Sequence, residues 1–505
     1  MIDMPALPRP VVMLIMALAG ALLVCGFAPF SWWGLTLVCP AILYAFVLGR
    51  TGRDAFSLGY VFGLFYFGFG VSWTYNSIHE FGHAPVLLSA VLVALLVLAL
   101  ALFPALTAAL YSWLRCDRAA DPRGALAFAT LWVLFEWVRG WIFTGFPWLL
   151  IGHAHHSSPL QGILPLLGSL GASWVALLIS CLVTVLVLGS TRHRLIGAAS
   201  LVPIAAALLL AGQVKWTTPQ QESLSVALIQ ANIPQELKWD RAQKRHILGK
   251  YLQLSEAHQD ADIIIWPETA IPAYYATVKD TFIPELEKIA AAGDVDFLVG
   301  LFTHDPDSGR VYNSVMTLGE EQSFYAKRHL VPFGEYIPLR NIASFLADYI
   351  VLPMSDMSSG AGRPLVRLKG HFAGASICYE VVYGDEVIEA MPEARFLINV
   401  SNDAWFGDSL APHQHLEIAR SRAIETGRYL LRATSTGISA VIDPGGAIVK
   451  QSAQFREEVV RAKIRPHTGL TPYSRWGDSA IIAILSGIFL IICLHRWYTL
   501  RSAKH

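Results

Sequence analysis

The sequence predicts a polytopic α-helical membrane protein that also carries a separate α/β domain. Of its 505 residues, 54% are hydrophobic and only 15% are charged, which is too apolar for an ordinary soluble protein. Apolar runs long enough to cross about 30 Å of hydrocarbon occupy most of residues 1–212 and return near the C-terminus. We therefore expect a membrane domain over 1–212, an α/β domain over 213–475, and a last membrane helix with its tail over 476–505.

Eight apolar runs are candidates for transmembrane helices, and we expect all eight to cross the membrane. Only Arg9 precedes the first run and a second run follows closely, so we expect a retained helix rather than a signal peptide. The runs cover residues 11–28, 33–49, 56–75, 85–113, 124–148, 162–189, 195–212 and 478–495.

The cations between these runs predict the orientation of the chain. Lys and Arg are retained on the cytoplasmic side of a membrane. With the N-terminus inside, the short outer connections at 29–32, 76–84 and 149–161 hold no Lys or Arg. The domain over 213–475 is then extracytoplasmic and both termini are cytoplasmic. The eleven cations on the inner side are Arg9, Arg50, Arg53, Arg115, Arg118, Arg123, Arg192, Arg194, Arg496, Arg501 and Lys504.

Two features of the membrane part have alternative interpretations. Glu136 and Arg139 lie three residues apart and so share a helix face, either as an ion pair that faces other helices or with Arg139 binding a lipid phosphate. His153, His155 and His156 suggest a metal, yet no carboxylate or cysteine stands nearby. We therefore expect these histidines to form hydrogen bonds at the membrane interface.

The segment 213–475 alternates β-rich runs with helical patterns, as α/β layered domains do. It contains 26 Lys and Arg against 31 Asp and Glu, so a nucleic-acid surface is not expected. The six cysteines of the chain form no CxxC pair, which argues against a zinc cluster or a disulfide framework. Strands are expected at 225–230, 262–266, 296–300, 312–318, 372–378, 395–400 and 437–442, and helices at 240–258, 280–292, 382–390 and 412–428.

Three polar residues stand at or just after the ends of predicted strands, where such domains place their chemistry. They are Glu268, Lys327 and Cys378. Taken singly, each has an ordinary interpretation: a solvated carboxylate, a surface lysine and a buried, inert cysteine. Together they supply a nucleophile, a general base and a cation for the developing oxyanion, which is what acyl transfer through a thiol requires.

Four strings around these residues resemble motifs of the nitrilase superfamily. That resemblance implies a four-layer αββα sandwich and a Glu-Lys-Cys triad. A nitrilase-like domain between a seventh and an eighth membrane helix resembles, more narrowly, the apolipoprotein N-acyltransferase family of bacterial inner-membrane enzymes. The strings are Trp266-Pro-Glu-Thr-Ala, Tyr325-Ala-Lys-Arg-His-Leu-Val-Pro-Phe-Gly-Glu, Ile377-Cys-Tyr-Glu and Ser401-Asn-Asp-Ala-Trp-Phe-Gly, joined in the membrane part by Glu136-Trp-Val-Arg-Gly-Trp and Phe146-Pro-Trp.

The resemblance implies that Glu268 is the general base, Lys327 the oxyanion partner and Cys378 the nucleophile. It also implies that Glu335 assists near the thiol, although Glu335 could simply cap the turn at Gly334. Three further roles follow at the site: the Tyr379 amide is a second oxyanion donor, Glu380 orients its neighbours, and Trp239 lines the site rather than the core.

The family's reaction moves an acyl chain from a phospholipid, through a cysteine thioester, to the α-amine of a diacylglyceryl-cysteine apolipoprotein. Neither metal nor ATP is expected to take part. The alternatives are a membrane-tethered amidase or nitrilase that hands its acyl group to water, and a transporter or receptor whose outer domain binds ligand.

Apolar loops are expected to exclude water from the thioester. Candidates are Tyr274 and Tyr275 within 271–275, and Phe345 and Leu346 within 345–354, although the latter run could also be ordinary core. His413 and His415 look like half of a metal site, but packing at the start of a helix is the expectation.

Overall fold

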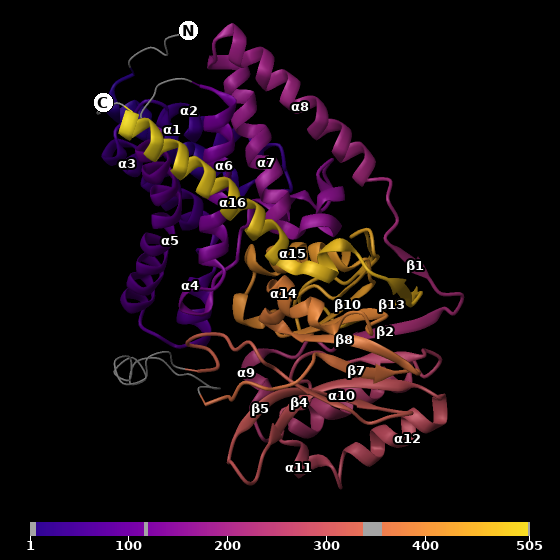
Figure 1. The fold of residues 1–505 in the computed structure, drawn as a ribbon. Coiled ribbons are helices and arrows are strands. Elements are labelled where there is room, and N and C mark those ends of the chain that lie inside the picture. Colours follow the sequence, from indigo (N-terminus) through magenta and orange to yellow (C-terminus); the bar gives the residue numbers. More distant parts are fainter. Residues whose placement is uncertain (1–6, 116–119, 337–355, 503–505) are drawn as a thin grey trace. The chain divides into compact units, whose positions relative to one another are not determined.

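The computed structural model describes residues 7–115, 120–336 and 356–502, and its chain forms two compact units. One unit comprises Met1–Tyr75, Leu87–Val214 and Trp476–His505. The other comprises Asn76–Val86 and Lys215–Arg475 (Figure 1).

The first unit is helical, and each of the eight apolar runs contains a helix. By length and composition, four helical segments of the described chain can cross a membrane: Val86–Leu114, Gln161–Leu188, Thr191–Ala211 and Pro472–Thr499. Gly52–Gly70 with Thr74–Phe81, bent by 59°, makes a fifth if the pair is one span. The helices are α1 (Arg9–Val24), α2 (Leu35–Val47), α3 (Gly52–Gly70), α5 (Val86–Leu114), α6 (Pro122–Arg139), α7 (Leu164–Leu188), α8 (Thr191–Ala211) and α16 (Pro472–Ser502).

The expected helix over 124–148 is wrong at its C-terminal end, because α6 ends at Arg139. Gly140 caps it, and the chain then turns back so that the Phe146 amide donates to the Arg139 carbonyl at 2.8 Å. Gly145 has φ +86°, and a Cβ there would lie 2.0 Å from the Gly140 carbonyl oxygen. The helix predicted from apolar composition alone was therefore too long, because it included a loop whose conformation requires glycine.

The second unit is built on two six-stranded sheets. In each sheet the central strands are parallel, β2–β3–β4 in one and β8–β9–β10 in the other. The first sheet has the order β13 (Glu458–Ile464), β2 (Leu224–Gln230), β3 (Ile263–Ile265), β4 (Asp296–His304), β5 (Val311–Leu318), β6 (Phe324–Ala326). The second has the order β12 (Ile448–Gln451), β11 (Ala440–Ile442), β10 (Leu430–Thr434), β9 (Phe396–Ser401), β8 (His371–Ile377), β7 (Leu365–Leu368).

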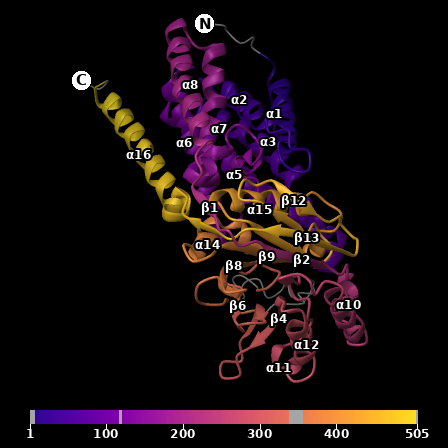
Figure 2. The ribbon, with the colours of Figure 1, turned by 90° about the vertical axis from the view of Figure 1, so that its right-hand side faces the viewer.

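The side chains of each strand alternate between two buried layers. On β3, Ile264 packs toward α10 (Lys244–Glu256) and α12 (Ile283–Gly293), whereas Ile263 and Ile265 enter the core between the sheets. Figures 1 and 2 show α14 (Gly384–Val387) and α15 (Ala411–Thr426) on the outer side of the second sheet. The predicted αββα sandwich is therefore present, and strand ends from both sheets supply the polar residues described next.

Candidate active site

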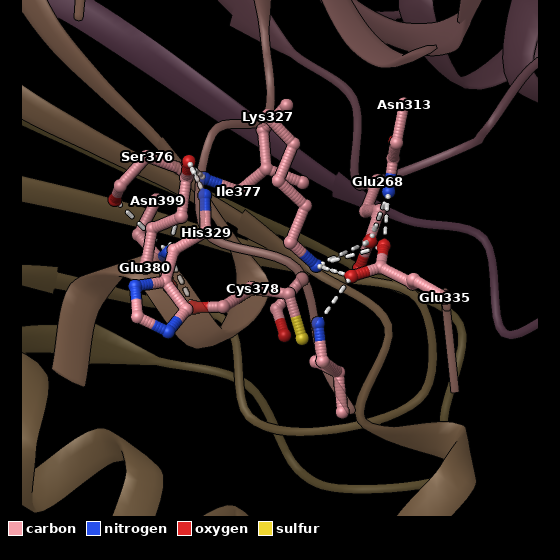
Figure 3. A network of polar contacts seen from close by, with 12 residues as sticks. Glu268, Asn313, Lys327, His329, Glu335, Ser376, Ile377, Cys378, Glu380 and Asn399 are labelled. Atoms are coloured by element: carbon pink, nitrogen blue, oxygen red, sulfur yellow. Dashed lines mark hydrogen bonds and ion pairs between the residues drawn. The ribbon is translucent and has the colours of Figure 1, made fainter. Parts of the chain in front are cut away.

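Strand ends from the two sheets bring the predicted triad together. Glu268 follows β3, Lys327 directly follows β6 of the same sheet, and Cys378 directly follows β8 of the other sheet. Glu268 and Lys327 are buried, with 4% and 1% of their surfaces exposed. Figure 3 shows the Lys327 ammonium beside the Glu268 and Glu335 carboxylates, with the Cys378 sulfur nearby.

Lys327 is shared unequally by two carboxylates. Its Nζ lies 2.8 Å from Glu335 Oε2 but 3.9 Å from Glu268 Oε1. Asn313, on β5, donates to Glu268 Oε1 at 2.7 Å and to Glu335 Oε1 at 3.2 Å. The close ion pair therefore belongs to Glu335, which leaves Glu268 the less tightly held carboxylate and the better placed to accept a proton.

Glu335 also fulfils the simpler role considered for it. Its Oε2 accepts the Val331 amide at 2.9 Å, and its own amide donates to the Val331 carbonyl at 2.9 Å. The same carboxylate therefore closes its loop and pairs with Lys327.

The electrostatics of the predicted triad keep the Cys378 thiol protonated, so a base has to remove its proton before the sulfur can react. Burial and the Glu268 carboxylate raise the pKa of Cys378 to about 12, against the opposing effect of Lys327. Burial also raises the pKa of Glu268, more than Lys327 and Asn313 lower it. For Lys327, burial disfavours the charge, but Glu335 and Glu268 outweigh it, so its pKa lies above the usual value and the ammonium persists.

The residues after Cys378 fix the turn that carries it. Cys378 starts the 3₁₀ helix Cys378–Val382 with φ +53°, a left-handed conformation that is rare for a residue with a side chain. Glu380 holds this turn through Oε2, which accepts the Ile377 amide at 2.7 Å, and its Oε1 accepts the Tyr325 hydroxyl at 2.8 Å and the Arg328 amide at 2.6 Å. Glu380 therefore links the Cys378 turn to the strand end that carries Lys327. The ring of Tyr379 packs against His329 and Tyr383.

Sequence reasoning missed two residues of this site, Asn313 and Lys238. Asn313 could have been noticed as an amide within the apolar β5, but nothing in the sequence distinguishes Lys238 from a surface lysine. The Lys238 side chain, 3% exposed, donates to the Glu268 carbonyl oxygen at 3.1 Å. Burial lowers the pKa of Lys238 to about 8, while Glu268 and Cys378 act in the opposite direction.

Lys238→Met should move the acid limb of the pH–rate profile to higher pH. Lys238 lowers the pKa of Glu268, so removing its charge raises that pKa further. As the predicted general base, Glu268 has to be ionised to accept the thiol proton, so we expect activity to be lost as pH falls through its pKa. The measurement is the rate of Cys378 acylation against pH, with exposed Lys279→Met as the matched control. An unchanged acid limb would contradict the interaction.

Trp239 and Tyr274 are exposed aromatic residues that share one neighbour. Trp239 stacks on Phe302 with centroids 5.8 Å apart, and Tyr274 lies 6.2 Å from the same ring. Trp239 is 39% exposed and Tyr274 44%, so neither is core. Tyr275 instead packs at the edge of the core under α10 and α12. The other suggested lid residues, Phe345 and Leu346, lie outside the described residues.

Glu136 and Arg139 are buried in the helical unit and contact the loop after α6. Arg139 Nη1 donates to the carbonyls of Phe146 and Trp148 at 2.9 and 2.5 Å, and its guanidinium lies over the Phe67 ring. Glu136 Oε1 accepts the Ile151 amide at 3.1 Å. These contacts order the loop, and a lipid-phosphate contact of Arg139 stays a prediction.

The predicted histidine clusters take different roles. His155 contacts Thr36 and Ser158 at 3.1 and 2.8 Å, and His156 contacts the His153 carbonyl at 3.1 Å, all in buried positions rather than at an exposed interface. In α15, His415 is buried near the start of the helix, as expected, and its Nε2 also lies 3.2 Å from the Cys378 carbonyl oxygen.

Comparisons with known proteins assign this chain to a family. The model of the apolipoprotein N-acyltransferase N-terminal domain matches residues 19–182, and the carbon-nitrogen hydrolase model matches residues 225–473. The apolipoprotein N-acyltransferase of Methylococcus capsulatus is 42% identical, with 96% of each chain covered. The Coxiella burnetii enzyme of that name is 39% identical, over 94% of this chain and 98% of its own. The Pseudomonas aeruginosa enzyme is 38% identical, over 94% of each chain. The match extends through both the membrane and the sandwich units, so the chain belongs to the apolipoprotein N-acyltransferase family, acyltransferases of the carbon-nitrogen hydrolase superfamily.

Proposed function

We propose that this protein transfers a fatty acyl chain from a membrane phospholipid to the α-amine of a diacylglyceryl-cysteine apolipoprotein, through a thioester on Cys378. The observation that carries the proposal is the group formed by the half-buried Cys378 and the buried Glu268 and Lys327, in a chain related to apolipoprotein N-acyltransferases over nearly its whole length.

The first half-reaction forms the thioester. Glu268 accepts the Cys378 proton as the sulfur attacks an ester carbonyl of the phospholipid. Lys327 and the Tyr379 amide stabilise the oxyanion of the tetrahedral intermediate. The C–O bond to the glycerol then breaks, Glu268 returns the proton to the departing oxygen, and lysophospholipid leaves.

The second half-reaction transfers the chain to nitrogen. A neutral α-amine attacks the thioester carbonyl, Glu268 takes the proton lost by nitrogen, and the thiolate of Cys378 leaves and regains a proton. An α-amine has a pKa of about 7.7 to 8.0, so part of it is neutral at pH 7. Two half-reactions through one covalent intermediate give ping-pong kinetics.

The energy for the amide comes from the oxygen ester, so the proposal involves neither ATP nor a metal cofactor. Water competes with the amine for the thioester, and its exclusion falls to apolar side chains around the site. The exposed rings of Trp239 and Tyr274 are the described candidates for contact with lipid chains.

The proposed setting is the bacterial inner membrane. Eight helices cross it, the domain over 213–475 faces the periplasm, and both termini are cytoplasmic. Support comes from the eleven cations on the proposed inner side against none in the short outer connections. The membrane domain over 1–212 and the helix and tail over 476–505 hold the catalytic domain at the surface from which both lipid substrates are drawn.

Product analysis separates transfer from hydrolysis. Purified protein is incubated with phospholipid and a synthetic diacylglyceryl-cysteine peptide, and the peptide is weighed by mass spectrometry. The proposal predicts a gain of one acyl chain and an equal amount of lysophospholipid. Release of free fatty acid with no change in the peptide would instead indicate a membrane-tethered amidase or nitrilase type of hydrolase.

A further inference from the structure

The backbone of Cys378 needs support that the proposed triad does not provide. A positive φ is unfavourable for a residue with a side chain, and Cys378 has φ +53°. Its carbonyl oxygen is contacted by two side chains from other elements: Asn399 Nδ2 on β9 at 3.3 Å and His415 Nε2 on α15 at 3.2 Å. Neither residue belongs to the proposed triad.

Arg432, on β10, determines which atoms these two residues present to Cys378. A guanidinium can only donate hydrogen bonds. Its Nη1 donates to Asn399 Oδ1, so the amide NH₂ of Asn399 faces Cys378. Its Nη2 lies 2.9 Å from His415 Nδ1, which also lies 3.1 Å from Asp403 Oδ1. Because the Cys378 carbonyl can only accept, the contact at Nε2 places an imidazole hydrogen there, and in the neutral ring Nδ1 accepts from Arg432. Both side chains are thereby oriented to donate to the same carbonyl.

The charge of Arg432 is balanced within the same buried group. Its Nη2 lies 2.7 Å from Asp403 Oδ2, and Asp403 Oδ1 accepts the Ser401 hydroxyl at 2.7 Å. Burial opposes ionisation of Asp403, but Arg432 outweighs it, so the pKa of Asp403 lies below its usual range. Burial and Arg432 lower the pKa of His415, which agrees with a neutral imidazole.

The hydrogen bonds to the Cys378 carbonyl also affect the Tyr379 amide, because both groups belong to the same peptide bond. The carbonyl of Cys378 and the amide N–H of Tyr379 belong to one planar trans unit and point in opposite directions. Holding the oxygen therefore fixes the direction of the Tyr379 N–H. Hydrogen bonds to a carbonyl also polarise its peptide group, which makes the N–H a stronger donor.

We propose that His415, together with Asn399, is a positioning residue: its Nε2–H holds the Cys378 carbonyl and thereby aims the Tyr379 amide at the oxyanion. Arg432 favours the neutral imidazole and fixes the amide orientation of Asn399 that this requires, and Asp403 balances the charge of Arg432. The inference rests on the proposed function, because it takes Cys378 as the nucleophile.

Two polar substitutions of similar size separate positioning from packing. In His415→Gln the side-chain amide nitrogen reaches the place of Nε2 and keeps a donor for the Cys378 carbonyl. In His415→Asn the amide reaches only the place of Nδ1, so the contact with Arg432 can persist while the donor to Cys378 is lost. His413→Gln, two residues earlier in the same helix, is the matched control.

The measurement is the single-turnover rate of Cys378 acylation by phospholipid, with kcat and KM for the donor and a thermal unfolding curve for each variant. His415→Asn should lower the acylation rate at least about 10-fold with KM unchanged, because the oxyanion exists only in the transition state. His415→Gln should stay within about 3-fold of the parent, and His413→Gln should match it.

Equal rates in the Asn and Gln variants, or a lower rate in Gln than in Asn, would overturn the positioning role. If the Asn variant does not fold, the Gln variant decides alone, and a loss of 10-fold or more in a folded Gln variant would overturn it. Failure of the proposed function is distinguishable, because the parent protein itself would then form no acyl adduct.

Discussion

Cys378→Ser is expected to lower the rate of acyl transfer by at least about 10³-fold, on the scale of removing a catalytic nucleophile. A serine hydroxyl is far less acidic than a thiol, and Glu268 is the base available to activate it. Burial and Glu268 already raise the pKa of the thiol to about 12. Removing the proton of a still less acidic serine hydroxyl at the same place is therefore much harder. The measurement is acyl transfer to the diacylglyceryl peptide, together with the mass of the enzyme after exposure to phospholipid.

The control for this variant is Cys493→Ser, in α16, a half-buried thiol far along the chain from the site. It should keep the parent's rate. A serine variant at 378 that transfers acyl chains at a comparable rate would exclude the thioester route, because no covalent step through sulfur would then be needed.

Lys327→Met is expected to abolish acyl transfer and also to lower the free energy of unfolding by about 3–5 kcal/mol, the usual effect of removing one partner of a buried ion pair. The lysine is 1% exposed and its Nζ lies 2.8 Å from Glu335 and 3.9 Å from Glu268. Without it, two buried carboxylates lose their shared cation. Chemical denaturation of the parent and the variant measures the loss.

The stability deficit of Lys327→Met should depend on pH. Lys327 lowers the pKa of Glu268, so its loss raises that pKa in the folded state. A buried carboxyl with a raised pKa destabilises the fold when ionised, so the deficit should be full at neutral pH and shrink as the pH falls and the carboxyl binds a proton. Lys327→Met/Glu335→Gln should regain stability but not activity. A deficit independent of pH would contradict the ion-pair origin.

The sheet strands predicted from sequence were those with long apolar runs. All seven expected strands overlap an observed strand, because a buried parallel strand is largely apolar, as β3 is throughout. Short or edge strands were missed, among them β7 and β12, since a pattern of four partly exposed residues resembles a loop. β10 was missed for another reason: it carries Arg432, a buried charge that only the contacts with Asp403 and Asn399 explain.

The residues of the site also divide into those that the sequence could predict and those that it could not. Glu268, Lys327, Glu335 and Cys378 stand in recognisable strings. The structure places Glu268, Lys327 and Cys378 after strand ends and Glu335 in the loop that follows Lys327. Lys238, Asn313 and His415 contact Glu268 or Cys378 across 30 to 45 positions of the chain, the largest separation being that of Asn313 and Glu268. A burial-dependent role of this kind has no local pattern, because the chemistry of a lysine or histidine depends on which groups the fold brings beside it.

The most direct test of the account is the intact mass of the purified protein after incubation with phospholipid alone. The account predicts an increase equal to one acyl chain in place of one hydrogen, located on Cys378, released by neutral hydroxylamine and lost on addition of the diacylglyceryl peptide, which gains the same mass. A protein that transfers acyl chains to the peptide while its own mass never changes, with Cys378 still open to alkylation throughout turnover, would contradict it.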